Sequence, residues 1–336
     1  MNLFLSDQGW TDNLAAELSA EPSAESSWVQ SELRLSPETR LGFARQLLPD
    51  ARPVEATSIN GWANFLVDEL LAALPNDPPW RWHLWSSYGE GTAGRNRVEL
   101  IRRAVIERLK KRRRHLLKNL RDVESPFSPD EALVQTALLS PDHGWLSIAQ
   151  APLPFDLRAL ISPFIAGDVP IAEDKAAPSR AFAKLVEAER RLGRFIASGD
   201  TVVDLGASPG SWSYVALNRG AKVTAVDRSP LRDDLMGNPN LTFAQADAFK
   251  FKPSDGTVDW LICDVIAAPQ RSMELLVEWL AEGLMRHFVV TLKFKGTDDY
   301  PLLRDLTAAA LPLCADFRLT RLCANKNEVT AFGSSR

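Results

Sequence analysis

The chain has little cysteine, and its few cysteines are not arranged for a metal or for a disulfide framework. Only Cys263, Cys314 and Cys323 occur among 336 residues, an odd number without a C-x-x-C spacing. This scarcity predicts reduced thiols within or beside strands, with neither a zinc or other metal site nor a structural disulfide.

Long hydrophobic runs are also absent. No stretch approaches eighteen consecutive apolar residues, and the opening MNLFLSDQGW lacks both a basic segment and a long apolar core. The pattern predicts no membrane span and no signal peptide, which favours the cytoplasm. With 45% apolar residues and ten tryptophans, the chain can fill two or three cores. No internal repeat is found.

The glycine fingerprint of a dinucleotide site, G-x-G-x-x-G, is missing too. Residues 201–210 read TVVDLGASPG instead, with Gly206 and Gly210 spaced G-x-x-x-G and Pro209 between them. The valine-rich run predicts a buried parallel strand, and residues 211–217 predict a helix. Because Pro209 removes an amide donor, the turn between them suits a nucleotide-sized ligand without phosphates.

Acidic residues stand at the ends of three successive predicted strands. Asp204 belongs to the first, Asp227 follows the strand 222–226, and Asp247 follows the strand 241–245. Each acid alone is typical of a solvated strand end. Together they match S-adenosylmethionine, with its ammonium near the first acid, its ribose near the second and its adenine amino group near the third.

Positive charge is concentrated in one stretch of an otherwise acidic chain. Residues 95–121 contain twelve Lys or Arg against Glu99 and Glu107, a net charge of +10 in a chain whose net charge is −4. Apolar residues at helical spacing predict a helix with a basic outer face. Such a helix binds RNA phosphates or is simply solvated. The candidate RNA-binding residues are Arg103, Lys110, Lys111, Arg112, Arg113, Arg114 and Lys118.

Seven segments give the chain a resemblance to a known family. It resembles the FtsJ-like ribose 2′-O-methyltransferases of RNA, and among them the bacterial 23S ribosomal RNA cytidine 2′-O-methyltransferases with an N-terminal THUMP domain. The segments are APSRAFAKL (177–185), DLGASPGSW (204–212), VDRSP (226–230), DAFKFKP (247–253), CDV (263–265), TLKFK (291–295) and NEVTAF (327–332).

The resemblance implies a catalytic tetrad of Lys184, Asp264, Lys293 and Glu328. It makes Lys293 the base that takes the proton of the ribose hydroxyl, which requires neighbouring positive charge or desolvation to lower the pKa of such a lysine. Lys184 would supply the charge, and the two carboxylates would orient the ammonium groups. The implied cofactor is S-adenosylmethionine, held by Ser179, Asp204, Gly206, Ser208, Pro209, Gly210, Ser211, Trp212, Asp227, Asp247 and Asp264.

Other interpretations of the tetrad remain open from the residues alone. Lys184 lies in an amphipathic helix pattern, in which most lysines face water. Glu328 could be a hairpin residue, whereas Lys293 ends a run apolar enough for a central strand, so its ammonium calls for a partner. The family usually has a cysteine and a second glycine where this chain has Ser208 and Ser211, which could alter cofactor affinity.

These patterns predict an α/β protein whose C-terminal domain, residues 178–336, has a Rossmann-like doubly wound sheet. Before it we expect α+β RNA-binding modules: a ferredoxin-like domain at 1–53, a THUMP-like domain at 54–150 that contains the basic helix, and a Pro-rich linker at 151–177. The expected function is methyl transfer to a ribose 2′-hydroxyl of RNA, with a cytidine of 23S ribosomal RNA as the target. Two alternatives are a methyltransferase acting on another substrate and a catalytically silent RNA-binding protein.

Overall fold

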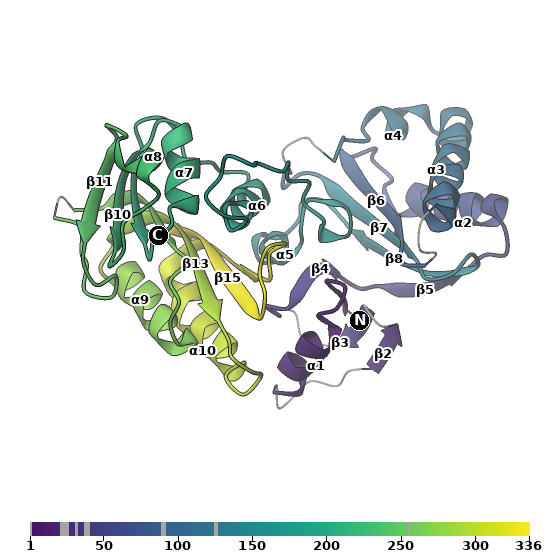
Figure 1. Ribbon diagram of the computed structural model, residues 1–336. Coiled ribbons are helices and arrows are strands. Elements are labelled where there is room, and N and C mark those ends of the chain that lie inside the picture. Colours follow the sequence, from purple (N-terminus) through teal and green to yellow (C-terminus); the bar gives the residue numbers. More distant parts are fainter. Residues whose placement is uncertain are drawn as a thin grey trace. The chain divides into compact units, whose positions relative to one another are not determined.

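The chain forms two compact units (Figure 1). The computed structural model describes residues 2–20, 27–30, 33–36, 41–88, 92–123, 127–254 and 256–336. The first unit comprises Met1–Thr11, Ser23–Thr39 and Ala44–Asp168, and the second comprises Asp12–Pro22, Arg40–Phe43 and Val169–Arg336. Two short segments from the start of the chain therefore belong to the second unit. Among the described residues, no helix is long and apolar enough to cross a membrane.

The first unit contains a small antiparallel sheet with the strand order β2-β3-β1-β4. Its strands are β1 (Asn2–Ser6), β2 (Ser27–Gln30), β3 (Leu33–Ser36) and β4 (Ala44–Leu48). Helix α1 (Thr11–Ser19) follows β1, but nearly all of it belongs to the second unit, so the compact units cross the boundaries expected for a domain at 1–53.

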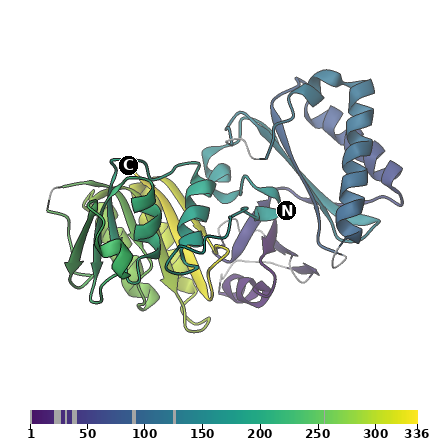
Figure 2. The ribbon, with the colours of Figure 1, turned by 45° about the horizontal axis from the view of Figure 1, so that its top comes forward.

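A second sheet of the first unit has the order β5-β8-β7-β6, with only β6 and β7 parallel to each other. Figure 2 shows its two long helices on the same side of the sheet. The core between these helices and the sheet contains Trp62, Trp80 and Trp82. The elements are β5 (Arg52–Glu55), α2 (Ile59–Ala73), β6 (Trp80–Ser86), α3 (Ala93–Arg112), α4 (Arg114–Lys118), β7 (Ala132–Leu138) and β8 (His143–Ala149).

The predicted basic helix is interrupted. Helix α3 buries Val98, Ile101, Val105 and Leu109 along one face, as its spacing predicts, but it ends before Arg113. Arg113 has a non-helical backbone with φ −159° and ψ 75°, and α4 begins at the next residue. The interruption turns the Arg113 side chain toward the end of α2, a contact that the sequence pattern does not reveal.

Much of the segment predicted as a linker at 151–177 is folded. It contains α5 (Phe155–Leu160) and the 3-10 turn η1 (Ile165–Gly167), and the first unit extends to Asp168. Gln46 on β4 holds this segment, because its side-chain amide donates to the carbonyls of Ser162 and Phe164 and accepts from the Ser162 amide. These bonds are largely buried, which ties the segment to the small sheet.

The second unit is built on a seven-stranded sheet with the order β11-β10-β9-β12-β13-β15-β14. The first five strands in this order are parallel, and β15 runs antiparallel to both of its neighbours. The strands are β9 (Thr201–Leu205), β10 (Lys222–Asp227), β11 (Leu241–Gln245), β12 (Val258–Cys263), β13 (Met285–Lys293), β14 (Cys314–Thr320) and β15 (Glu328–Ser335).

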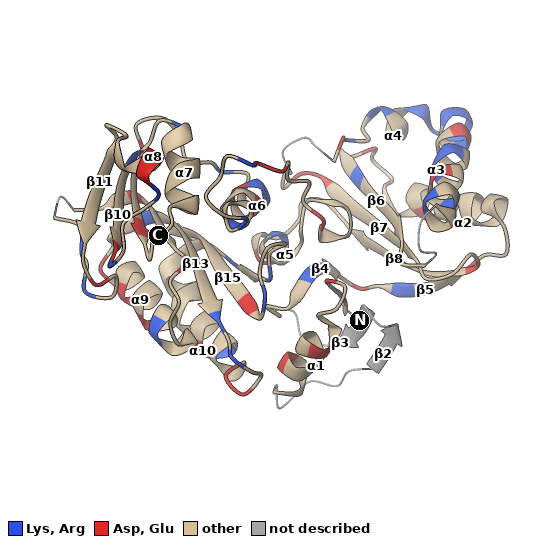
Figure 3. Cartoon of the chain, viewed as in Figure 1, with Lys and Arg blue, Asp and Glu red and all other residues tan. Residues whose placement is uncertain are grey.

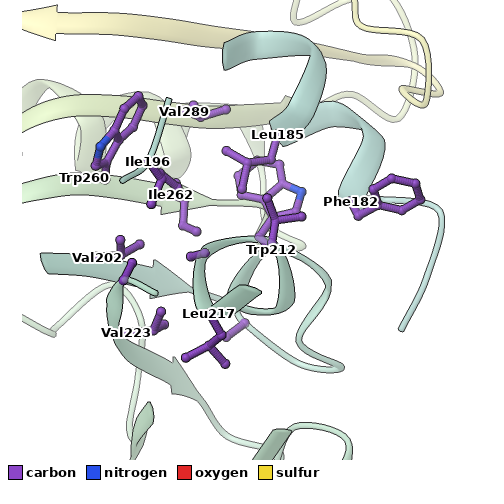
Figure 4. Packing of buried hydrophobic residues seen from close by; sticks show 14 of the residues in the cluster. Phe182, Leu185, Ile196, Val202, Trp212, Leu217, Val223, Trp260, Ile262 and Val289 are labelled. Atoms are coloured by element: carbon purple, nitrogen blue, oxygen red, sulfur yellow. The ribbon is translucent and has the colours of Figure 1, made fainter. Parts of the chain in front are cut away.

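Helices cover both faces of this sheet, as expected for a doubly wound fold (Figure 1). On one face, Leu185 and Trp212 pack over Val202 and Ile262 of the central strands (Figure 4). The helical elements are α6 (Phe182–Leu192), α7 (Ser211–Asn218), α8 (Asp233–Met236), α9 (Pro269–Ala281), α10 (Pro301–Ala310) and η2 (Leu311–Leu313). The strand order reverses between β9 and β12, and the carboxyl ends of these two strands open a crevice there.

Candidate active site

Two adjoining cavities lie at the point where the strand order reverses. The first has a volume of about 310 Å³ and the second about 250 Å³, and Gly206, Asp227, Val265 and Ile266 line both. The first cavity is also lined by a larger group of the predicted residues: Ser179, Asp204, Ser208, Pro209, Ser211, Trp212, Asp264 and Lys293. Asp247 lies in the second cavity.

The loop after β9 requires glycine at both predicted positions. Gly206 has φ +74°, and a Cβ there would stand 2.8 Å from the Cα of Val265. Gly210 has φ +106°, and a Cβ there would stand 2.5 Å from Cδ1 of Leu235. Both values lie in the region that side chains rarely adopt. The first glycine lets two loops meet at the wall of the cavities, and the second lets the chain turn into α7.

The three strand-end acids follow one another along the two cavities. Asp204 is 2% exposed and accepts a hydrogen bond of 2.7 Å from the Ser213 hydroxyl, and its burial raises the pKa of its carboxyl group to about 7. Asp227, between the cavities, accepts from the amides of Ser208 at 3.0 Å and Ser229 at 2.9 Å. Asp204 is thereby fixed by α7, and Asp227 by the loops that follow β9 and β10.

Asp247 has a different environment from the other two acids. It accepts from the Phe249 amide at 3.1 Å and from the Arg228 guanidinium at 3.1 Å. These bonds, with the Phe249 amide as the largest cause, lower the pKa of its carboxyl group. The guanidinium of Arg271 lies 3.9 Å from the centre of the Phe249 ring. The second cavity therefore offers a carboxylate acceptor beside an aromatic ring and a cation.

The remaining residues of the cavity wall are linked by short polar contacts. The hydroxyls of Ser179 and Ser211 lie 2.7 Å apart, and the Ser208 hydroxyl donates to the Pro230 carbonyl. Trp212 is 2% exposed, and its indole N–H donates to the Ala181 carbonyl at 2.8 Å. Trp212 therefore fixes the segment before α6 against the first cavity, with most of its ring in the core.

The four residues of the predicted tetrad form one contiguous cluster. Nζ of Lys184 donates to both carboxylate oxygens of Asp264 at 2.8 and 2.9 Å and to Oε2 of Glu328 at 2.9 Å. Nζ of Lys293 lies 2.7 Å from the carbonyl oxygen of Asp264 and 3.1 Å from its Oδ1. Two cations and two carboxylates thus share one network, which balances their charges in a partly buried place.

The two lysines occupy different positions in this cluster. The side chain of Lys184 is 5% exposed, and its three N–H groups can be assigned to the three carboxylate oxygens around it. The side chain of Lys293 is 19% exposed and lines the first cavity together with Asp264. The expectation from pattern alone that Lys184 faces water is wrong, because its helix buries that face against Asp264 and Glu328.

The sequence did not single out several residues of the cavity walls. Ile266 is 90% exposed although it is a large apolar residue, and it lies at the edge of both cavities. Phe249 and Arg271 line the second cavity. The position of Ile266, two residues beyond Asp264, is the one signal that could have found it. Arg271 lies in α9, and its proximity to Phe249 follows only from the fold.

Lys and Arg residues follow one another along α3 and α4 (Figure 3), but their side chains differ in their partners. Arg113 pairs with Asp77 at 2.8 Å and donates to the Leu71 and Pro75 carbonyls, so it anchors the end of α2. Two others are also paired, Lys110 with Glu107 and Arg112 with Asp68. Four candidate RNA-binding residues are exposed and form no ion pair with a carboxylate of the described residues. They are Arg103, Lys111, Arg114 and Lys118.

Comparisons with known proteins agree with this geometry. Residues 177–293 match the FtsJ-like methyltransferase family. A ribosomal RNA large subunit methyltransferase M of Thauera aminoaromatica is 36% identical over 167 residues, which cover 46% of each chain, so this match spans about half the length of that relative. The enzyme of the same name from Xylella fastidiosa (strain M12) is 30% identical over 314 residues, covering 88% of this chain and 82% of the relative.

A solved structure of a ribosomal RNA methyltransferase from Plasmodium falciparum is 18% identical, with a TM-score of 0.37, and covers 47% of this chain and 97% of that one. The doubly wound sheet, its switch-point cavities and the FtsJ-like match define a Rossmann-like methyltransferase domain. The chain belongs to the ribosomal RNA large subunit methyltransferase M family.

Proposed function

We propose that the protein transfers a methyl group from S-adenosylmethionine to a ribose 2′-hydroxyl of RNA, with a cytidine of 23S ribosomal RNA as the target. The observation that carries the proposal is the placement of Lys293 at the wall of the first cavity, in one network with Asp264, Lys184 and Glu328. A cluster of this kind can take a proton from a weakly acidic hydroxyl. The names of the relatives support ribosomal RNA as the substrate.

The polar groups of the two cavities fit S-adenosylmethionine. Asp204 would accept the amino-acid ammonium, Asp227 the two ribose hydroxyls and Asp247 the adenine amino group, beside the Phe249 ring. Gly206 supports this fit, because a side chain there would collide with the loop at Val265 and narrow the passage between the cavities. When bound, S-adenosylmethionine supplies an electrophilic methyl group on a sulfonium.

The residues of this chain would divide the chemistry among themselves. Lys293 Nζ would take the proton of the 2′-hydroxyl as the ribose oxygen bonds the methyl carbon, whose bond to the sulfonium sulfur breaks and leaves a neutral thioether. Asp264 orients Lys293 through its carbonyl and its Oδ1. Lys184 holds Asp264 and Glu328 in place and supplies positive charge close to Lys293. The cavity wall would hold the hydroxyl and the methyl group in line, which would supply a large part of the acceleration.

Removing the acid between the cavities should weaken cofactor binding. Asp227→Ala deletes the acceptor of the ribose hydroxyls, and we expect a loss of about 1–3 kcal/mol in the free energy of S-adenosylmethionine binding. Calorimetry on the folded variant measures it. Asp259→Ala serves as control, because Asp259 is an acid of the same sheet at the opposite strand ends, where it accepts from Thr201. Equal affinities of wild type and Asp227→Ala would remove Asp227 from the site.

Cofactor affinity should depend on pH through Asp204. Because the pKa of Asp204 is about 7, the carboxyl is mostly protonated below that pH and must lose its proton to pair with an ammonium. Affinity should therefore rise by up to about tenfold per pH unit between pH 5.5 and 7 and then level off. Titrations at several pH values test this, and Asp204→Asn should bind weakly with no such rise. A wild-type affinity independent of pH over this range would contradict the pairing.

The first unit would serve as the RNA-binding part. The sheet β2-β3-β1-β4 and the sheet β5-β8-β7-β6 with its two helices are offered as the ferredoxin-like and THUMP-like modules. The exposed cations of α3 and α4 would contact RNA phosphates without reading bases. A phosphate-binding surface favours a nucleic acid over a small-molecule substrate. An enzyme that modifies ribosomal RNA would act in the cytoplasm.

Mapping of ribose methylation tests the proposed function directly. A 2′-O-methyl group blocks alkaline cleavage at the next phosphodiester, so ribosomal RNA from cells with and without the gene should differ at one cytidine of the large subunit RNA. Purified protein with S-adenosylmethionine should restore the modification to RNA from the deleted strain. An identical cleavage pattern in both strains would contradict the proposed target and favour a methyltransferase that acts on another substrate. A protein that binds RNA without methylating it would favour the catalytically silent alternative.

A further inference from the structure

The N-terminal segments of the second unit pack beside the end of β15 that carries Glu328. Glu17 of α1 is 4% exposed, and its carboxylate accepts from the amides of Gly42 at 2.7 Å and Phe43 at 2.9 Å. The Gly42 carbonyl accepts from the Arg321 amide at 2.6 Å. A Cβ on Gly42 would stand 2.9 Å from Cγ1 of Val329, the residue that follows Glu328.

Aromatic rings continue this contact toward Lys293. The ring of Phe43 lies 4.7 Å from that of Tyr300 and 6.4 Å from that of Phe294, the residue after Lys293. Phe294 and Tyr300 meet edge to face at 5.1 Å. An edge-to-face pair such as that of Phe294 and Tyr300 is favourable beyond the area it buries. The N-terminal segment is therefore part of the packing directly behind the catalytic cluster.

A hydrogen-bond network joins the same segment to the loop before Glu328. Asn13 of α1 donates to the Tyr300 hydroxyl at 2.5 Å and to Oδ1 of Asn327 at 3.3 Å, and the Tyr300 hydroxyl donates to Oδ1 of Asn327 at 2.6 Å. The Asn327 side chain in turn donates to the Gly296 carbonyl at 2.9 Å. Tyr300 is 1% exposed, so its hydroxyl depends on these partners.

Asn327 lies at the end of the strand pair that carries two tetrad residues. Lys293 of β13 and Glu328 of β15 are direct partners in the antiparallel register, and one step further the Phe294 amide donates to the Asn327 carbonyl at 2.9 Å. The hydrogen-bonded residue pairs at the end of two paired strands separate most easily. The side-chain bonds of Asn327 close this end of the ladder immediately beyond the catalytic pair.

We infer that Asn13 and Tyr300 are positioning residues: through Asn327 they hold the end of the β13–β15 ladder and so fix Lys293 and Glu328. This inference rests on the proposed methyl transfer. Neither residue touches the cavities, so neither should affect binding of cofactor or RNA. A loosened ladder end would shift Lys293 away from the hydroxyl whose proton it takes, and small displacements of this kind are costly to the rate.

The test uses the full chain with Tyr300→Phe, Asn13→Ala and the double variant. Each single variant should lower kcat by roughly tenfold to a hundredfold while KM for RNA and the Kd of S-adenosylmethionine stay within twofold of wild type. The double variant should be no slower than the slower single one, because both act through Asn327. The matched control is Ser335→Ala, which removes a hydroxyl at the other end of β15, where it donates to the Met285 carbonyl.

The outcomes separate this inference from the function on which it rests. No methyl transfer by the wild-type protein would overturn both. Wild-type turnover with an unchanged kcat in the folded Tyr300→Phe and Asn13→Ala proteins would overturn the positioning role alone. An equal loss of kcat in Ser335→Ala would also overturn it, because the effect would then be general loosening of the strand. A fall in kcat confined to the two network variants, with binding intact, would support it.

Discussion

Lys293→Ala is expected to lower the rate of methyl transfer by about 10²–10⁴-fold, the usual contribution of a positioned base. Binding of S-adenosylmethionine and of RNA should change little, because Lys293 supplies one part of a cavity wall that Asp204, Asp227 and the loop after β9 also form. Single-turnover rates and equilibrium binding, measured on the same preparation, separate the two effects.

Lys293→Arg distinguishes a base from a fixed positive charge. An arginine stays protonated at every usable pH and cannot take the hydroxyl proton, so this variant should be as inactive as the alanine variant. Lys184 should not substitute, because it is buried behind the cavity with its donors engaged by Asp264 and Glu328.

A lysine far from the cavities controls for the loss of one cation. Lys222 is exposed at the amino end of β10, on the edge of the sheet opposite the cavities, and Lys222→Ala should retain wild-type turnover. Near-normal turnover by Lys293→Arg on the same RNA would show that Lys293 only supplies positive charge. The base would then have to be sought in solvent or at another group.

The strand ends of the second unit could be predicted from sequence because each marks an abrupt change in chemistry. Apolar β-branched runs stop at Asp204, Asp227 and Lys293, and a polar or charged residue that ends a buried strand lies at one edge of a parallel sheet. That edge is where such folds bind ligands. The roles of the acids and of Lys293 in cofactor binding and catalysis remain predictions, but their convergence follows from the topology.

The partners of Lys184 could not be predicted from its own helix. Its pattern is amphipathic, and nothing local indicates that this lysine faces Asp264, 80 residues away, and Glu328, 144 residues away. Pairing between distant elements follows only from the sheet order. For the same reason the sequence did not predict the contacts of Asn13 and Glu17, which lie near the start of the chain but pack in the second unit.

The basic stretch shows a third limit of sequence reasoning. Its net charge could be counted from the sequence, but the sequence does not reveal which of its cations are paired with carboxylates. Arg113 interrupts the predicted helix to reach Asp77 and two backbone carbonyls, so it contributes to the fold of the first unit. Arg112 and Lys110 face Asp68 and Glu107. The charge presented to a ligand is therefore smaller than the composition suggests and is carried by fewer residues.

Replacing Lys111, Arg114 and Lys118 with glutamine is expected to weaken RNA binding on the order of tenfold to a hundredfold. All three are exposed, and no carboxylate within the described ranges pairs with them, so their charges are the ones free to displace counterions. The slope of log affinity against log salt should become shallower by about 0.7–0.9 for each phosphate that the variant no longer neutralises. Filter binding or anisotropy at several salt concentrations measures both.

The paired cations Lys110 and Arg112 of α3 provide the comparison. Lys110→Gln with Arg112→Gln removes two charges that Glu107 and Asp68 already neutralise, so the loss of affinity per charge and the change in slope should both be smaller. S-adenosylmethionine binding should be unchanged in both sets, because the cavities lie in the second unit. If the triple glutamine variant kept the affinity and salt slope of the wild type, α3 and α4 would be a solvated surface, and the RNA contacts would have to lie elsewhere.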